Sequence, residues 1–187
     1  MKKSKKQAFL CVLWVGMSWA ACGQIPANPS FEDPETEVEN LYGDLAAHWG
    51  RWGAWMNRES AWSPTHSGIG LIGYHHWEIQ AADESGLYQD VKEIPAGKNI
   101  TFSIYAYSDR DTNVQSVELR LEKLGGYEVL ASQVYSMEHL KTATWTALSV
   151  TGRNVSEGVR VLVIVKPAPA PPRRGAVKFD DAAMEFE

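Results

Sequence analysis

Cysteine is nearly absent from this 187-residue chain: there are two, Cys11 and Cys22, and both lie near the N-terminus. Because no cysteine follows Cys22, a folded domain in the rest of the chain cannot be held by a disulfide bond. Long apolar stretches are equally scarce, and the one at residues 8–21 covers only about 14 residues. A membrane-spanning helix needs roughly 20 apolar residues, so a permanent span is not predicted.

The first 22 residues carry the pattern of a signal peptide. Four lysines occur within the first six residues, and the apolar stretch and the small residues Ala20 and Ala21 follow them. This order of charged, apolar and small residues predicts cleavage and export. The segment 20–23, Ala-Ala-Cys-Gly, also resembles a bacterial lipobox, which would place a lipid anchor on Cys22. Either outcome predicts an exported protein that is secreted, periplasmic or attached to the cell surface.

Basic residues are too few for a nucleic-acid-binding surface. The whole chain has 18 Lys and Arg against 23 Asp and Glu, and the signal peptide holds four of the lysines and no acidic residue. The remainder therefore has 14 basic and 23 acidic side chains, a net charge of −9. Such a surface repels nucleic acid. The remaining length, about 165 residues, is enough for one domain with its own core.

Sustained helical periodicity is also absent, and only residues 38–46 have a loose amphipathic spacing that predicts a short helical turn. Alternation dominates instead. In residues 99–107 apolar side chains alternate with Thr, Ser and Tyr, which predicts a half-buried strand. Gly125 and Gly126 predict a hairpin turn between two such runs. The other predicted strands are 70–78, 85–92, 116–122, 127–135, 143–150, 159–165 and 176–187. This number and spacing predict an all-β, antiparallel two-sheet sandwich.

Short motifs at the two ends of the predicted domain occur together in a known family. Residues 28–32 read Asn-Pro-Ser-Phe-Glu, and residues 177–181 read Val-Lys-Phe-Asp-Asp. Between them follow 66–68 (His-Ser-Gly), 86–91 (Gly-Leu-Tyr-Gln-Asp-Val) and Trp145. With these landmarks, residues 27–187 resemble the jelly-roll carbohydrate-binding modules of families 4, 9, 16 and 22, which have galactose-binding-like folds. The resemblance implies one β-sandwich that binds a glycan or polysaccharide and has no catalytic role.

The same resemblance implies a structural calcium ion that ties the first strand to the last. Carried over to this chain, its ligands are the side chains of Glu32 and Asp180 and the backbone carbonyls of Ser30 and Gly68. Asp181 is the alternative to Asp180. Two carboxylates and nearby carbonyls suit Ca²⁺, which takes six to eight oxygen ligands. The alternative is that these carboxylates are only solvated groups at strand ends.

Aromatic residues are concentrated in one region, since five of the eight tryptophans fall within residues 49–77. A sugar has an apolar C–H face and a rim of hydroxyls, so proteins bind it with aromatic rings and a few polar groups. Because Trp is highly buried on average, about half of these aromatics are expected in the core. Trp145 is expected there too. The predicted ligand-facing residues are Trp52, Trp55, Tyr74, Trp77 and Tyr105, with Arg51 and Gln89 as polar partners.

Two other function classes stay open. Sandwich domains also serve structural or protein-adhesion roles, because a fold does not determine function. Small jelly rolls can also be polysaccharide lyases, and residues 117–120, Val-Glu-Leu-Arg, weakly resemble a lyase strand, but the other lyase motifs are missing. Glu118 and Arg120 are therefore predicted to form a charged pair on the outer face of a strand. The sequence has no nucleophile elbow or phosphate loop, so no catalytic residue is predicted.

Overall fold

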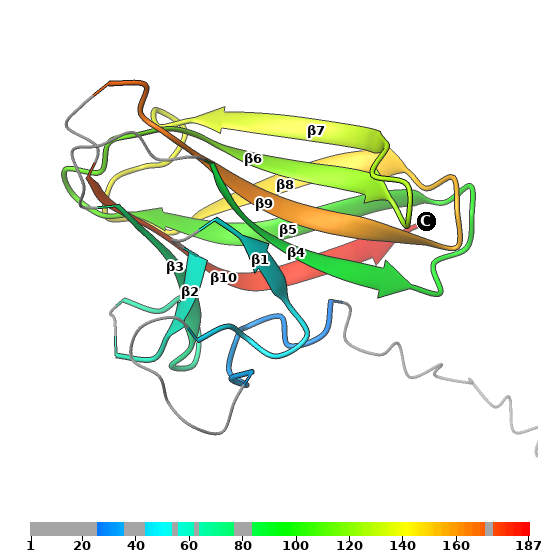
Figure 1. The fold of residues 1–187 in the computed structure, drawn as a ribbon, viewed down its shortest axis with the longest axis horizontal. Coiled ribbons are helices and arrows are strands. Elements are labelled where there is room, and N and C mark those ends of the chain that lie inside the picture. The colour runs from blue at the N-terminus through cyan, green and yellow to red at the C-terminus, as the bar shows by residue number, and fades with distance from the viewer. Residues whose placement is uncertain (1–25, 36–43, 54–55, 62–63, 77–83, 171–173) are drawn as a thin grey trace, which may run out of the picture.

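The computed structural model describes residues 26–35, 44–53, 56–61, 64–76, 84–170 and 174–187. Ten strands form two antiparallel sheets of five, stacked as two layers (Figure 1). The first sheet has the order β1 (Gly50–Trp52), β4 (Ser85–Lys92), β9 (Gly158–Pro167), β6 (Val114–Lys123) and β7 (Val129–Ser136). The second has the order β2 (Met56–Glu59), β3 (Leu71–His76), β10 (Gly175–Phe186), β5 (Asn99–Ser108) and β8 (Thr146–Arg153). The predicted all-β antiparallel sandwich is confirmed.

The core lies between the two sheets and is built by the alternation that the sequence shows. In β5 the side chains of Ile100, Phe102, Ile104 and Ala106 are buried, while the intervening residues are only partly covered. Alternate side chains of a strand point to opposite faces, so each sheet contributes one apolar face. The first sheet supplies, among others, Leu87, Val117, Leu119, Leu121, Val159, Val161, Val163 and Val165 to this core.

The turns and strands of the structure lie close to their predicted positions, and the structure has two strands that were not predicted. The β6–β7 hairpin turns at Gly125, whose φ of 76° is a left-handed conformation that favours glycine. β9 lies in the middle of its sheet, as its apolar sequence predicts. The additional strands, β1 and β2, have only three and four residues. The helical turn predicted at 38–46 lies mostly outside the described residues.

The segment before β1 is fixed to the second sheet through its backbone. Phe31 is fully buried, and the Arg58 side chain donates hydrogen bonds to the carbonyls of Phe31 and Glu32, each at 2.7 Å. The N–H of Ala182 in β10 donates to the carbonyl of Pro29 at 2.9 Å. The N-terminal part of the domain is therefore joined to the last strand by a backbone hydrogen bond.

One side chain connects the edges of the two sheets. The hydroxyl of Tyr135 in β7 donates to the carbonyl of Ser149 in β8 at 2.6 Å and accepts the Ser149 N–H at 2.8 Å. β7 and β8 are edge strands of different sheets.

Within the described residues, no helix is long and apolar enough to cross a membrane.

Candidate functional site

The outer face of the first sheet combines aromatic rings with a set of charged side chains. Because Leu87 and Val91 of β4 point into the core, Tyr88 and Asp90 point outward. The same alternation applies along β6 and β9. We call this surface the first-sheet face; its residues are Trp52, Tyr88, Asp90, Lys92, Glu118, Arg120, Glu122, Arg160, Leu162, Ile164 and Lys166.

Two glycines allow the aromatic rings of this face to lie close to the sheet. Trp52 pairs with Gly86 and Tyr88 pairs with Gly50 across the β1–β4 ladder. A Cβ atom on Gly86 would overlap the Trp52 ring, and one on Gly50 would overlap the Tyr88 ring. Each ring therefore covers the space left by the opposite glycine. The two ring centroids are 6.3 Å apart with a tilt of 36°, so the rings form one neighbouring pair.

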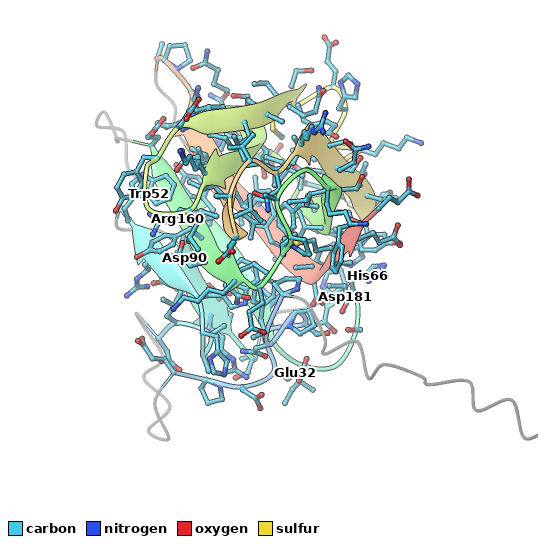
Figure 2. The ribbon with its side chains drawn as sticks, turned by 90° about the vertical axis from the view of Figure 1, so that its right-hand side faces the viewer. Glu32, Trp52, His66, Asp90, Arg160 and Asp181 are labelled. Carbon is cyan, nitrogen blue, oxygen red and sulfur yellow. The ribbon has the colours of Figure 1, made fainter. Side chains whose placement is uncertain are left out.

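Arg160 extends this aromatic pair with a fixed charged group. Its Nε and Nη2 donate to the two carboxylate oxygens of Asp90 at 2.6 and 2.9 Å. Its guanidinium carbon lies 4.5 Å from the centre of the Tyr88 ring and 4.8 Å from that of Tyr127. Hydrogen bonds to Asp90 raise the pKa of Arg160 above its ordinary value. Figure 2 shows Trp52, Arg160 and Asp90 next to one another on one side of the molecule.

Further across the sheet, Glu118 is the centre of an ionic network. It accepts hydrogen bonds from Arg120 Nε and from Ser132 Oγ, both at 2.8 Å, and its other oxygen lies 3.2 Å from Lys166 Nζ. Arg120 also reaches Glu122 at 3.3 Å. Burial raises the pKa of Glu118, but the hydrogen bonds from Arg120, Ser132 and Lys166 lower it to about 2. Glu118 is therefore an ionised carboxylate at neutral pH, and the predicted Glu118–Arg120 pair is present.

This geometry suits a ligand that has one flat apolar side and a polar rim. The rings of Trp52 and Tyr88 supply an apolar surface, and the ion pairs beside them hold donors and acceptors in fixed positions. Adjacent strands lie about 4.8 Å apart, so the five strands from β1 to β7 span roughly 19 Å. An extended ligand that crosses the strands could therefore contact rings at one end and charged groups at the other.

The residues predicted to bind calcium lie together on the second sheet, around residues 66–70. Glu32 Oε1 accepts the backbone N–H groups of Ile69 and Gly70, both at 3.0 Å. Asp180 Oδ2 accepts those of His66 and Ser67 at 2.9 and 3.0 Å. The two carboxylates thus hold one loop against β10. We call residues 66–70 the clamped loop.

Ser30 and Gly68 belong to the same neighbourhood. Gly68, with a φ of 50°, lies directly against the Glu32 carboxylate, and Ser30 hydrogen-bonds to Asp181. Asp181 also contacts His66 Nδ1 at 2.5 Å and accepts a hydrogen bond from Ser67 Oγ at 2.6 Å. The chain therefore brings the predicted calcium residues to one place, although they are far apart in sequence.

The two adjacent aspartates of this region have opposite pKa shifts. Burial raises the pKa of Asp180 to about 6, and the charge of Asp181 adds to this although backbone N–H groups oppose it. Burial also acts on Asp181, but hydrogen bonds from His66, Ser67 and Ser30 outweigh it and lower the pKa. Asp180 is thus a buried carboxylate whose hydrogen bonds come from backbone amides.

The chemistry of this region fits calcium in part. Oxygen ligands and an acidic residue with a raised pKa favour a hard cation. However, the carboxylates also accept N–H groups, which cannot bind a cation, and no cluster of three His, Cys, Asp or Glu suited to a metal occurs among the described residues. Calcium binding stays a prediction.

The structure places the predicted ligand-facing aromatics in different environments. Trp52 lies on the first-sheet face, whereas Tyr105 lies on the outer face of the second sheet and stacks on His66 with centroids 3.7 Å apart. The prediction is wrong for Tyr74, which is fully buried because it occupies an inward position of β3 next to Ile72. Trp55 and Trp77 lie outside the described residues.

The predicted polar partners have structural contacts. The prediction is wrong for Gln89, which is 6% exposed and bonds the N–H and carbonyl of Ala27 at 2.7 and 3.0 Å. It points inward because it alternates with Tyr88 and Asp90. Arg51 donates to the carbonyl of Met56 at 2.9 Å and to the Asn57 side chain, so it joins β1 to β2.

Trp145 was expected in the core, and this expectation is also wrong. Its side chain is only partly buried, and the residue directly precedes β8. The indole contacts Tyr107 and His66, with centroids 5.4 and 5.5 Å apart. Together with Tyr105 these rings form a second aromatic group, on the outer face of the second sheet.

Several residues of the first-sheet face were missed by the sequence interpretation. They are Tyr88, Asp90, Glu122, Arg160 and Lys166. A signal for two of them is present, because Gly86, Tyr88 and Asp90 alternate along a predicted strand. The lone Arg160 in an otherwise apolar strand is another. The pairing of Gly50 with Tyr88, however, depends on a strand register that the sequence does not reveal.

No family model matches the sequence, and a search of curated proteins finds no match. Solved structures do share the fold. TmCBM61, solved in complex with β-1,4-galactotriose, is 18% identical, with a TM-score of 0.60 over 88% of this chain and 99% of the other. A carbohydrate-binding module of the β-sandwich superfamily, described as promiscuous in specificity, is 13% identical, with a TM-score of 0.53 over 75% of this chain and 58% of the other.

Other proteins with the same fold have a different described activity. A cyclase from Fischerella sp. TAU, solved with 4-(1H-indol-3-yl)butan-2-one, is 15% identical, with a TM-score of 0.60 over 88% of this chain and 98% of the other. At such low identity these likenesses establish the β-sandwich fold alone.

Proposed function

We propose that this chain is an exported, non-catalytic carbohydrate-binding β-sandwich whose ligand lies on the first-sheet face. The observation that carries the proposal is the pair of rings, Trp52 and Tyr88, that lie over Gly86 and Gly50. A sugar ring can place its apolar C–H side on such a surface and direct its hydroxyls to the charged groups beside it.

The fold likeness supports this class of ligand. TmCBM61 has the same fold and was solved with a galactose trisaccharide. The carbohydrate-binding modules of the β-sandwich superfamily are a second example. The particular family, 4, 9, 16 or 22, stays part of the proposal, as do export, the signal peptide over 1–22 and the alternative of a lipid anchor at Cys22.

The ionic state of the first-sheet face supports a role in binding and not in catalysis. A general acid has to carry a proton near the working pH, and the Glu118 pKa of about 2 prevents this at neutral pH. The Asp90 carboxylate is held in a bidentate pair with Arg160. The cyclase likeness is the reason to test for turnover together with binding.

Calcium is included as a structural ion of the proposed domain. Glu32 and Asp180 would bind it with their carboxylates, and Ser30 and Gly68 with carbonyl oxygens. Its role would be to hold the segment before β1 and the clamped loop against β10, away from the first-sheet face. The raised pKa of the buried Asp180 supports this assignment.

The test compares tryptophans on opposite faces of the molecule. Trp52→Ala removes part of the first-sheet aromatic pair, whereas Trp145→Ala removes a partly buried tryptophan from the second sheet. Binding to a panel of polysaccharides is measured by titration calorimetry and affinity electrophoresis. We expect Trp52→Ala to weaken binding by at least about tenfold, because stacking and burial of a sugar face are lost. Trp145→Ala should bind as the natural protein does.

Three outcomes would contradict the proposal or a part of it. Loss of binding only in Trp145→Ala would move the ligand to the second sheet. No binding to any polysaccharide, with intact folding by circular dichroism, would favour a structural or protein-adhesion sandwich. Release of reducing or unsaturated ends from a polysaccharide would contradict the non-catalytic part.

A further inference from the structure

Three of the four cations of the first-sheet face, Arg120, Arg160 and Lys166, are each paired with a carboxylate of the same face, whereas Lys92 at the end of β4 is exposed. Arg160 is paired with Asp90, and Lys166 with Glu118. Arg120 lies between Glu118 and Glu122. The N–O distances range from 2.6 to 3.3 Å. This set has three positive and three negative groups, so the face has charged side chains but little net charge.

These pairs leave little capacity for an acidic ligand. The Arg160 guanidinium gives two N–H groups to Asp90, and the rings of Tyr88 and Tyr127 lie within 5 Å of its carbon. A guanidinium has five N–H groups, but a ligand carboxylate that made the same bidentate contact would have to displace Asp90 from Arg160, and the displaced carboxylate would lose its partner. It would also approach a chain whose net charge is −5.

A sugar hydroxyl meets no such obstacle. It is both a donor and an acceptor, so one hydroxyl can donate to a carboxylate and accept from the neighbouring cation. An adjacent donor and acceptor of this kind, both partly exposed, occur at Arg160 with Asp90. A ligand carboxylate or sulfate is acceptor-only, so it matches just half of each pair.

We propose that the first-sheet face selects uncharged glycans and rejects those that carry uronate or sulfate groups. This selectivity rests on the proposed function, because it concerns the same site. The selectivity arises because oppositely charged side chains within the face neutralise one another. It does not depend on the size of the ligand.

The experiment uses one glycan backbone in three charge states. The neutral polysaccharide that binds best is oxidised at its C6 hydroxyl to a carboxylate, and part of this product is converted to the methyl ester. We expect the carboxylate form to bind at least about tenfold more weakly than the parent. The ester, which is bulkier but neutral, should recover most of the affinity. Affinity for the parent should change little with salt, because surface charge interactions are screened and neutral contacts are not.

A variant tests the role of the pairs directly. Asp90→Asn removes the carboxylate partner of Arg160 and is exposed enough to be tolerated, with 36% of the Asp90 side chain accessible. It should gain salt-sensitive affinity for the carboxylate polymer. The control, Asp111→Asn, makes the same change of charge at an exposed residue beyond the other end of β6. It should show no such gain.

Each outcome separates the selectivity from the proposed function. Equal binding of the neutral and carboxylate forms would overturn the selectivity and leave glycan binding intact. Loss of binding to both the carboxylate and the ester would also overturn it, because size and not charge would then decide. An equal gain in both variants would assign the effect to net charge. Failure to bind any polysaccharide would refute the proposed function and the selectivity together.

Discussion

Glu118 on the first sheet and Asp180 on the second are both buried carboxylates, but their environments differ. Glu118 is 4% exposed and Asp180 is fully buried. The pKa of Glu118 is about 2, whereas that of Asp180 is about 6. Cations surround the first, and backbone N–H groups with a second carboxylate surround the other. Burial alone therefore does not set the charge state of a carboxylate, because its hydrogen-bonding and charged partners decide it.

The same difference has a functional meaning. The first-sheet face already contains the positive charge that its carboxylates need, so it has no need of a bound cation. The region around Asp180 has a carboxylate that would become more stable in its ionised form if a cation approached. This difference agrees with the two proposals made above, in which the first-sheet face binds a neutral glycan and the Asp180 region binds a calcium ion.

The largest expected effect comes from removing the cation between the first-sheet carboxylates. Arg120→Leu leaves Glu118 and Glu122, which are 4% and 6% exposed, without this partner. Breaking a buried ion pair costs about 3–5 kcal/mol, and the partial exposure of Arg120 places this case near the lower end. Urea denaturation measures the loss. In the control, Arg160→Leu, the partner is the more exposed Asp90, and about 1 kcal/mol or less is expected. Equal losses would contradict the comparison.

The pH dependence of stability should show the two carboxylates with opposite signs. Asp180 binds its proton more tightly in the folded protein, so it contributes stability below pH 4 that is lost as the pH rises through about 6. Glu118 contributes stability above about pH 4.5 that is lost as the pH falls toward 2. Each shift corresponds to about 3 kcal/mol at full extent. Urea unfolding between pH 2 and 8 measures both; in Glu118→Gln the acid-side loss should shrink.

Calcium should act on the Asp180 region alone. At a concentration about 100 times its Kd, a ligand that binds only the folded state adds about 2.7 kcal/mol of stability. We expect calcium to raise Tm at pH 7 and to have a smaller effect at pH 4.5, where Asp180 holds a proton more often. The Asp180→Ala variant should lose the effect, while Asp111→Asn should keep it. If saturating calcium leaves the Tm of the natural protein unchanged, the calcium site is refuted.

A smaller effect is expected from the clamped loop. His66→Ala removes the stack on Tyr105 and the contact with Asp181, but it keeps the backbone N–H that Asp180 accepts. Because His66 is partly exposed, the expected loss is about 1 kcal/mol. Thermal denaturation measures it. The control, Ile69→Ala, changes a side chain that is 64% exposed in the same loop and should be within about 0.5 kcal/mol of the natural protein.

Much of the fold could be predicted because the alternation of apolar and polar side chains indicates which residues form strands. In β5, β6 and β9 the apolar residues at every second position lie in the core, although Leu162 and Ile164 of β9 face outward. The glycines at 125 and 126 form the predicted turn. The short strands β1 and β2 could not be predicted, since three or four residues show no clear period. Their place depends on pairing with β4 and β3.

The candidate site was predicted in part for the same reason. Trp52 belongs to a conspicuous aromatic segment, whereas Tyr88 gains its role from the opposite Gly50, which is 38 positions away. Tyr74 was predicted to face a ligand but is buried. An aromatic residue in a strand faces the core or the solvent according to whether it occupies an inward or an outward position of the alternation. The composition of the segment does not reveal which positions point inward. The buried Ile72, two residues before Tyr74, lies on the same face of the strand and does reveal it.

The hydroxyl of Tyr135 has one more consequence. An edge strand with unsatisfied backbone groups is a template on which another molecule can pair its own strand, the first step toward aggregation. At Ser149 the tyrosine occupies both the N–H and the carbonyl that such an intruding strand would use. A single phenol thus protects this stretch of β8 from intermolecular pairing, and it does so from within the same chain.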